Sequence, residues 1–269
     1  MDEIVKELKE SISRLAERDD ANFIDGQTNI YDVPIVGVTK TDDPLFKKFK
    51  EDESIIGDIF CMPEEWLSGA KSVISYFLPF SEKVKSSNYS DGPCSTEWLH
   101  ARFQGEEFNN NVRRLIIEEI QIRGGEAVGP LLEEKFFKDF EVYTSNWSER
   151  HVAYIAGLGT FSHSRSLITA KGTAGRFGSI ITDLELIPTK REYDDPYSYC
   201  PYTTEGKCGK CIDRCPAGAI SKETKDKSIC AKHLLETDLT KKEREEFGYP
   251  YSPCGKCQTK VPCESGIPK

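Results

Sequence analysis

Apolar residues near the N-terminus recur at intervals of three and four, at Ile4, Val5, Leu8, Ile12 and Leu15. This spacing predicts an amphipathic helix over residues 3–18 whose apolar face packs on a core. The same period returns further along the chain, at Phe108, Val112, Leu115, Ile116 and Ile120. It predicts a long helix over residues 97–123, which Gly124-Gly125 ends.

Two largely apolar runs predict buried strands. One follows the turn at Gly69-Ala70 and reaches Phe77, and the other extends from Phe177 to Leu186. Between them, residues 152–156 have a helical apolar pattern that Gly157-Leu158-Gly159 ends. Strands that alternate with helices predict an α+β fold whose N-terminal domain is of α/β type, with a central sheet flanked by helices.

The polar, proline-containing stretch 189–196 is typical of a domain boundary. We therefore expect an N-terminal cofactor-binding domain over residues 1–190 and a second domain over residues 191–269. A chain of 269 residues is long enough for one large domain or two modest ones.

Charge and hydropathy narrow the possible partners. The formal net charge of −9 argues against a general basic footprint for nucleic acid. No apolar run approaches the roughly 20 residues needed to span a bilayer. The chain opens with Met1-Asp2-Glu3-Ile4 and not with an apolar signal segment. We expect a cytoplasmic protein in a reducing compartment, without membrane attachment.

Cysteines carry the clearest chemistry, because eight of the ten lie in the last 70 residues. In bacterial two-cluster ferredoxins, three nearby thiolates bind one cube, and a fourth, followed by proline, binds the other. Pro216 follows Cys215 in this way. Eight thiolates serve two 4Fe–4S clusters with none left over, so the C-terminal part is predicted to be a bacterial-ferredoxin-like two-cluster module.

This interleaved pattern divides the cysteines into two sets. One cluster is predicted on Cys200, Cys208, Cys211 and Cys263. The other is predicted on Cys215, Cys230, Cys254 and Cys257. The remaining two, Cys61 and Cys94, are typical of small buried apolar residues.

Other cysteine chemistries remain alternatives. Zinc takes four-cysteine sites built from two CxxC pairs, and Cys208/Cys211 with Cys254/Cys257 would make one. That site would leave four thiols without a role. A disulfide framework conflicts with the expected reducing compartment.

Two runs of small residues could approach a bulky group. The segment 156–164 contains Gly-Leu-Gly followed by a serine and a histidine, but it lacks the third glycine of the dinucleotide fingerprint. A second run extends from Gly172 to Gly178. Such backbone would suit a large planar cofactor, and turns that merely pack tightly are the alternative.

The order of several short motifs resembles the epoxyqueuosine reductases and, more distantly, the corrinoid-dependent reductive dehalogenases. The motifs are Gly69–Ile74, Glu149-Arg150, Ala156–Gly159, Leu167-Ile168, Phe177-Gly178, Thr182–Leu186 and Cys215–Ile220. The resemblance covers roughly residues 60–265. It implies a cobalamin held between an α/β-type domain and a two-cluster ferredoxin module, with the clusters supplying electrons to the cobalt.

The resemblance also assigns site residues. The corrinoid-contacting positions it implies are Ala156, Gly157, Leu158, Gly159, Ser162, His163, Gly175, Phe177 and Gly178. The family's catalytic aspartate falls within the stretch that reads VYTSNWSER here, residues 142–150, at the position of Tyr143. A phenol can donate a proton, although its ordinary pKa is about 10, so Tyr143 is the predicted catalytic acid.

Two departures argue against tRNA as a partner. The family motif that ends in Asp-Tyr-His reads ARFQGEEFN here, so the tyrosine and histidine are replaced by Phe108 and Asn109. The chain also ends six residues after Cys263, without the family's C-terminal helical extension.

Two functions follow as hypotheses. The first is a cobalamin-dependent iron–sulfur reductase of a small organic molecule, with a ferredoxin or flavodoxin as electron donor. The second is an electron-transfer protein without a substrate of its own, which passes electrons to a partner such as a corrinoid protein. The cofactor-like loops favour the first hypothesis, and the replaced acid favours the second.

Overall fold

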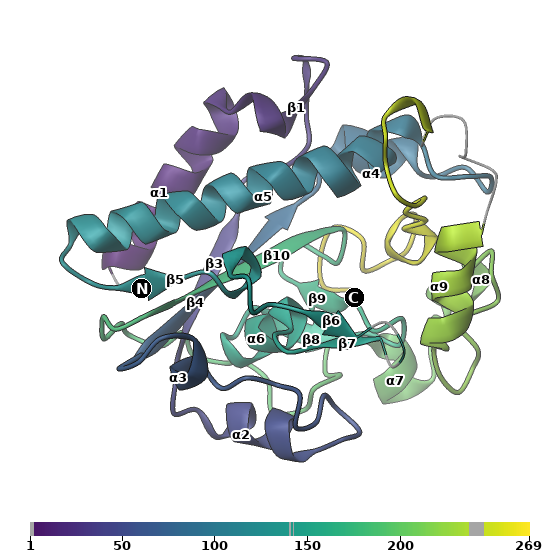
Figure 1. Cartoon of the computed structure of the whole chain (residues 1–269). Coiled ribbons are helices and arrows are strands. Elements are labelled where there is room, and N and C mark those ends of the chain that lie inside the picture. Colours follow the sequence, from purple (N-terminus) through teal and green to yellow (C-terminus); the bar gives the residue numbers. More distant parts are fainter. Residues whose placement is uncertain (1–2, 140, 142, 237–244) are drawn as a thin grey trace.

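The computed structural model describes residues 3–139, 141, 143–236 and 245–269 (Figure 1). The α-helices are α1 (Glu3–Arg18), α2 (Pro44–Glu51), α3 (Pro63–Trp66), α4 (Glu82–Ser87), α5 (Thr96–Ile122), α6 (Glu149–Ile155), α7 (Pro201–Glu205), α8 (Lys210–Asp213) and α9 (Lys227–Glu236). The strands are β1 (Phe23–Ile24), β2 (Thr28–Asn29), β3 (Ile35–Lys40), β4 (Ser72–Pro79), β5 (Ala127–Val128), β6 (Lys138–Asp139), β7 (Thr144–Ser145), β8 (Gly159–Phe161), β9 (Leu167–Thr169) and β10 (Gly175–Thr182). Short 3₁₀ helices are η1 (Asp20–Asn22), η2 (Pro130–Leu132) and η4 (Lys256–Gln258).

The central sheet has the strand order β3–β4–β10–β5. Phe77 in the middle of β4 lies opposite Ile35 of β3 and Phe177 of β10. All three pairings in this sheet are antiparallel, so the predicted central sheet is present but differs from the parallel sheet of an α/β-type domain. The alternation of strands and helices in a sequence does not determine strand direction, which explains the difference.

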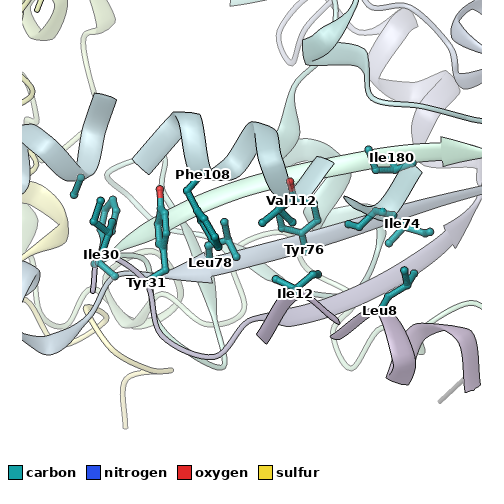
Figure 2. Packing of buried hydrophobic residues seen from close by; sticks show 14 of the residues in the cluster. Leu8, Ile12, Ile30, Tyr31, Ile74, Tyr76, Leu78, Phe108, Val112 and Ile180 are labelled. Atoms are coloured by element: carbon teal, nitrogen blue, oxygen red, sulfur yellow. The ribbon is translucent and has the colours of Figure 1, made fainter. Parts of the chain in front are cut away.

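Side chains of β4 alternate between two cores, because successive residues of a strand point to opposite faces. Ile74, Tyr76 and Leu78 belong to the cluster that also contains apolar residues of α1 and α5 (Figure 2). Val73 and Phe77 belong to a second cluster with residues of α2, α3 and α6. Helices therefore cover both faces of the sheet, and each such buried side chain contributes roughly 1.5–3 kcal/mol to burial free energy.

The two long predicted helices are confirmed as α1 and α5. Ser95 accepts a hydrogen bond from the backbone nitrogen of Trp98 and so caps the start of α5. Gly124, with φ of +79°, follows its end. The predicted strand to Leu186 ends earlier, at Thr182, because the Thr182 hydroxyl accepts a hydrogen bond from Leu184 and the chain turns out of the sheet.

The cysteine-rich part docks on the connection between α4 and α5. Lys256, only 1% exposed, donates hydrogen bonds from Nζ to the backbone oxygen and Oδ1 of Asn88 and to the carbonyl of Pro93. Arg214 donates to the carbonyl of Asn88 and to Asp91. The division into domains at residue 190 stays a prediction. Within the described ranges, no helix combines the length and apolar character needed to cross a membrane.

Candidate cluster and cofactor site

Three cysteines close together in the sequence and a fourth more than 50 residues later line one cavity between α7, α8 and the C-terminal segment. These are Cys200, Cys208, Cys211 and Cys263, called here the first cysteine group. Ser162 and Ser164 from the loop between β8 and β9 line the same cavity. Cys208 is exposed and has a φ of +88°, a backbone conformation that is rare outside glycine.

The other four C-terminal cysteines line a second cavity of about 260 Å³. These are Cys215, Cys230, Cys254 and Cys257, called here the second cysteine group. The cavity extends to the aromatic rings of Trp98 and Tyr251 and to the backbone of Gly255. A side chain at Gly255 would lie 2.1 Å from the Trp98 ring, so only glycine permits this close approach.

The structure thus gathers the cysteines in the interleaved sets that the spacing predicts. The quartet proposed for zinc is divided, because Cys208 and Cys211 face one cavity, while Cys254 and Cys257 face the other. Among the residues that the structure describes, no three His, Cys, Asp or Glu side chains are placed to hold a single metal ion. Cluster binding by the eight cysteines stays a prediction.

Burial controls the thiol chemistry. Burial, together with the charge of neighbouring thiols, raises the pKa of Cys211, Cys254 and Cys263 to about 12. Without metal these thiols hold their protons at neutral pH. Iron coordination replaces those protons and supplies the positive charge that a buried thiolate needs.

The two groups approach each other where α8 packs on η4. Cys211 belongs to α8 and Cys257 to η4. After burial, the charge of Cys257 is the strongest influence on the pKa of Cys211, although the two thiols belong to different groups. Groups bound at the two cavities would therefore be neighbours.

The predicted corrinoid loop splits into two parts. Residues 156–159 line neither cysteine cavity. Gly159 pairs with Thr169, and a side chain there would lie 2.0 Å from the carbonyl oxygen of Ile168. Gly157, with φ of +80°, follows the end of α6. Close packing of the chain on itself explains these glycines, and corrinoid contact by Ala156 to Gly159 stays a prediction.

The second part of the loop reaches the first cysteine group. The backbone nitrogen of His163 donates a hydrogen bond to Cys200 Sγ at 3.4 Å. The His163 ring Nε2 lies 2.7 Å from the carbonyl oxygen of Ser221 and donates to it when protonated there. His163 therefore connects two cysteine-bearing segments, while a cobalamin contact by Ser162 and His163 is untested.

Of the predicted residues on β10, only Gly175 lines the second cavity. The ring of Phe177 packs on Phe77 with centroids 4.6 Å apart. A side chain at Gly178 would lie 2.2 Å from the Tyr76 ring. Phe177 and Gly178 thus serve the packing of the sheet, and their cofactor contacts stay predictions.

Tyr143 lies in the connection between β6 and β7 and lines neither cysteine cavity. Its backbone has a φ of +54°, and its carbonyl oxygen accepts a hydrogen bond from Lys227 Nζ at 3.2 Å. Its neighbour Val142 lies outside the described residues. A proton-donating role for Tyr143 stays a prediction.

Sequence reasoning missed the cations of the second cavity. Arg150 and Lys225 line it together with the second cysteine group. Desolvation lowers the pKa of Arg150, while the charge of Cys257 raises it. Arg150 is exposed by its surface area, but it lines a cavity. The protein around that cavity accounts for the desolvation. Arg150 stood within the Glu-Arg motif, but no sequence pattern shows where its side chain points.

A buried polar network links the three elements that carry the arginines of this cavity. Arg113, fully buried on α5, donates hydrogen bonds to Glu106 at 2.9 Å and to Glu149 at 3.4 Å. Ser179 donates to Glu149, and Trp147 Nε1 donates to Ser179 at 2.9 Å. The network therefore joins α5, α6 and β10.

Comparisons with known proteins agree with this architecture. No family model matches the chain. An epoxyqueuosine reductase of Bacillus anthracis is 29% identical over 215 residues, which are 76% of this chain and 51% of that protein. A tetrachloroethene reductive dehalogenase of Dehalobacter restrictus is 34% identical over 116 residues, which are 39% of this chain and 20% of that protein. The chain spans about half the length of the curated epoxyqueuosine reductases that it matches first.

Solved structures share the fold. An epoxyqueuosine reductase crystallised with an epoxyqueuosine-modified tRNA stem loop has a TM-score of 0.55 and 21% identity, with 98% of this chain and 67% of that chain covered. A catabolic reductive dehalogenase has a TM-score of 0.51 and 13% identity, with 87% of this chain and 30% of that chain covered. The chain thus belongs to a class of proteins with a mixed α and β fold of this kind. Within that class it is similar in sequence to the epoxyqueuosine reductases and, over a shorter stretch, to the reductive dehalogenases.

Proposed function

We propose that this protein is an iron–sulfur oxidoreductase that passes single electrons through two 4Fe–4S clusters. The observation that carries the proposal is the gathering of eight cysteines around two cavities, four to each. Four thiol donors are the ligand set of one such cluster, so the residues present fit two of them. Relatives named as reductases and reductive dehalogenases support the redox class.

The chain's own residues would hold the clusters and tune them. Cys208 is exposed, so the first cysteine group is the proposed entry point for electrons from a ferredoxin or flavodoxin. Cys211 and Cys257 would bring the two clusters close together. Arg150 and Lys225 would offset the negative charge of the cluster held by the second cysteine group and of its thiolates. The proposed path therefore leads from the protein surface to the second cavity.

In the reductase form of this proposal, a small organic molecule is the substrate, and the relatives suggest cobalamin as the electron acceptor. When bound, a corrinoid supplies a cobalt centre that can carry the reduction. The cavity at the second cysteine group, about 260 Å³, is smaller than the roughly 300–1,000 Å³ of pockets for drug-sized ligands. The predicted loop at Ala156 to Gly159 does not line it either, so this arrangement does not accommodate a corrinoid, and we derive no step through one.

A second function, an electron-transfer protein that serves a partner redox protein, is supported by the packing of that loop on the chain itself. One experiment separates the two. Protein reconstituted anaerobically with iron and sulfide is expected to hold about eight irons per chain, because each cube contains four. Aquocobalamin is then added, and free and bound corrinoid are separated by gel filtration. Retained corrinoid supports the reductase, and iron without corrinoid supports the carrier. Fewer than about four irons per chain would contradict both.

A further inference from the structure

Two arginines that line the second cavity interact electrostatically with each other. Arg102 of α5 and Arg176 of β10 both line the cavity. Desolvation lowers the pKa of Arg176, and among charged groups Arg102 has the largest effect on it, as expected for neighbouring like charges. Two guanidinium groups held together in this way repel each other unless an anion lies between them.

The protein itself supplies little to neutralise this pair. Arg176 Nε is buried and has no hydrogen-bond partner among the residues that the structure describes. Among the described residues, the Arg102 guanidinium lies 4.0 Å from Glu106 and over the rings of Phe103 and Tyr251. A buried donor without a partner destabilises the folded protein, so a ligand that accepts from Arg176 recovers that cost.

Cations also outnumber carboxylates in this part of the molecule. Those that interact electrostatically here are Arg102, Arg113, Lys138 and Arg176. The nearby carboxylate of Glu106 already pairs with Arg113 at 2.9 Å. Glu149 pairs with Arg113 as well and accepts from Ser179. This local excess of positive charge stands out in a chain whose formal net charge is −9.

The cysteines do not explain this pair of arginines. Arg150 and Lys225 interact electrostatically with Cys257 and Cys230, respectively. The groups that influence Arg176 are Arg102, Tyr31, Glu106 and Tyr251, none of which is a thiol. The cavity thus has one set of cations that interacts with its cysteines and another set that does not.

We propose that Arg102 and Arg176 bind the carboxylate or phosphate group of a small organic anion that is the substrate of this protein. Guanidinium groups bind both anions through paired, charge-assisted hydrogen bonds. Trp98 and Tyr251 line the same cavity and offer an apolar surface to the body of the molecule. The identification of this anion as a substrate rests on the proposed function, while the anion site itself rests on the arginines alone.

Calorimetric titration of the anaerobically reconstituted protein tests the proposal with three probes: benzoate, its neutral isostere benzamide, and inorganic phosphate. Benzoate or phosphate is expected to bind saturably at millimolar concentration, and benzamide at least about tenfold more weakly than benzoate. Arg102→Gln and Arg176→Gln should each weaken anion binding about tenfold or more. Arg114→Gln removes the same charge from the exposed face of α5 and should change nothing.

Several results overturn the proposal. These are no saturable anion binding, equal affinity for benzoate and benzamide, or an effect of Arg114→Gln as large as that of the other two variants. The phosphodiester of a cobalamin tail is the other possible source of the anion. If both variants weaken aquocobalamin binding but leave binding of cobinamide, which lacks that phosphodiester, unchanged, the site serves the cofactor and the substrate inference fails.

Iron content, measured on the same samples, separates this inference from the proposed function. Loss of iron in Arg102→Gln and Arg176→Gln, with Arg114→Gln intact, would assign the pair to the cluster and overturn the anion site. Wild-type protein that binds anions through these arginines but holds no iron would leave the anion site standing and overturn the proposed function.

Discussion

The two cysteine cavities have different electrostatic surroundings. The first is lined by serine hydroxyls, prolines and Tyr202, and its only lining cation among the described residues, Lys210, lies 3.4 Å from Asp213. The second is lined by three arginines and by Lys225. Positive charge stabilises the reduced, more negative state of a cluster and raises its potential. The difference therefore favours electron flow from the first cavity to the second.

Exposure points in the same direction. Cys208 of the first group is exposed, whereas all four cysteines of the second group are partly buried. A donor protein would therefore meet the first group, and the second would face the interior cavity with its arginines. Charge and access together give the two sites distinct roles, entry and delivery.

Serine substitutions in the two cysteine groups have the largest expected effect. Each should remove the cluster of its own cavity and leave the other cluster in place. Cys263→Ser should remove the first cluster and Cys254→Ser the second, each with a loss of about four of about eight irons, because one missing thiolate opens a cube. Iron analysis and EPR spectra of the reduced proteins measure this. Cys61→Ser, outside both groups, should keep all the iron. The interleaved assignment fails if both substitutions remove the same EPR signal.

The cysteine assignment also shows how far the sequence leads. The periodicity of α1 and α5 and the apolar run of β4 could be predicted, because burial of one face imposes a period. The grouping of Cys263 with Cys200, over 60 residues away, followed from the ferredoxin spacing. Small residues were ambiguous, since a glycine such as Gly159 serves a close approach to protein or to cofactor equally well. The arginine pair of the second cavity had no signal, because tertiary packing of α5 against β10 brings the two side chains together.

Substitution of Arg113 tests whether the buried ion pairs behind the elements of the second cavity stabilise the fold. Arg113→Met leaves the carboxylates of Glu106 and Glu149 without their partner. The free energy of unfolding is expected to fall by about 3–5 kcal/mol, as when one member of a buried ion pair is removed. Urea denaturation measures it, with the exposed Arg114→Met changing it by less than about 0.5 kcal/mol. Similar effects of the two variants would mean that the network does not support the fold.

Removal of the cations beside the second cysteine group tests the expected difference in reduction potential between the two clusters. Arg150→Gln combined with Lys225→Gln should lower the potential of the second cluster by roughly 30–70 mV, since two partly screened charges no longer stabilise its reduced state. EPR-monitored redox titration in the Cys263→Ser background, where only that cluster is expected, measures the shift. Lys210→Gln in the Cys254→Ser background should move the first cluster less. A rise in the second potential would reverse the proposed direction of electron flow.

Anomalous diffraction at the iron edge, from crystals of the anaerobically reconstituted protein, tests the central claim most directly. The account predicts two separate iron peaks, one within bonding distance of Cys200, Cys208, Cys211 and Cys263, and the other within bonding distance of Cys215, Cys230, Cys254 and Cys257. A single peak, or a metal ion shared by Cys208, Cys211, Cys254 and Cys257, would contradict it.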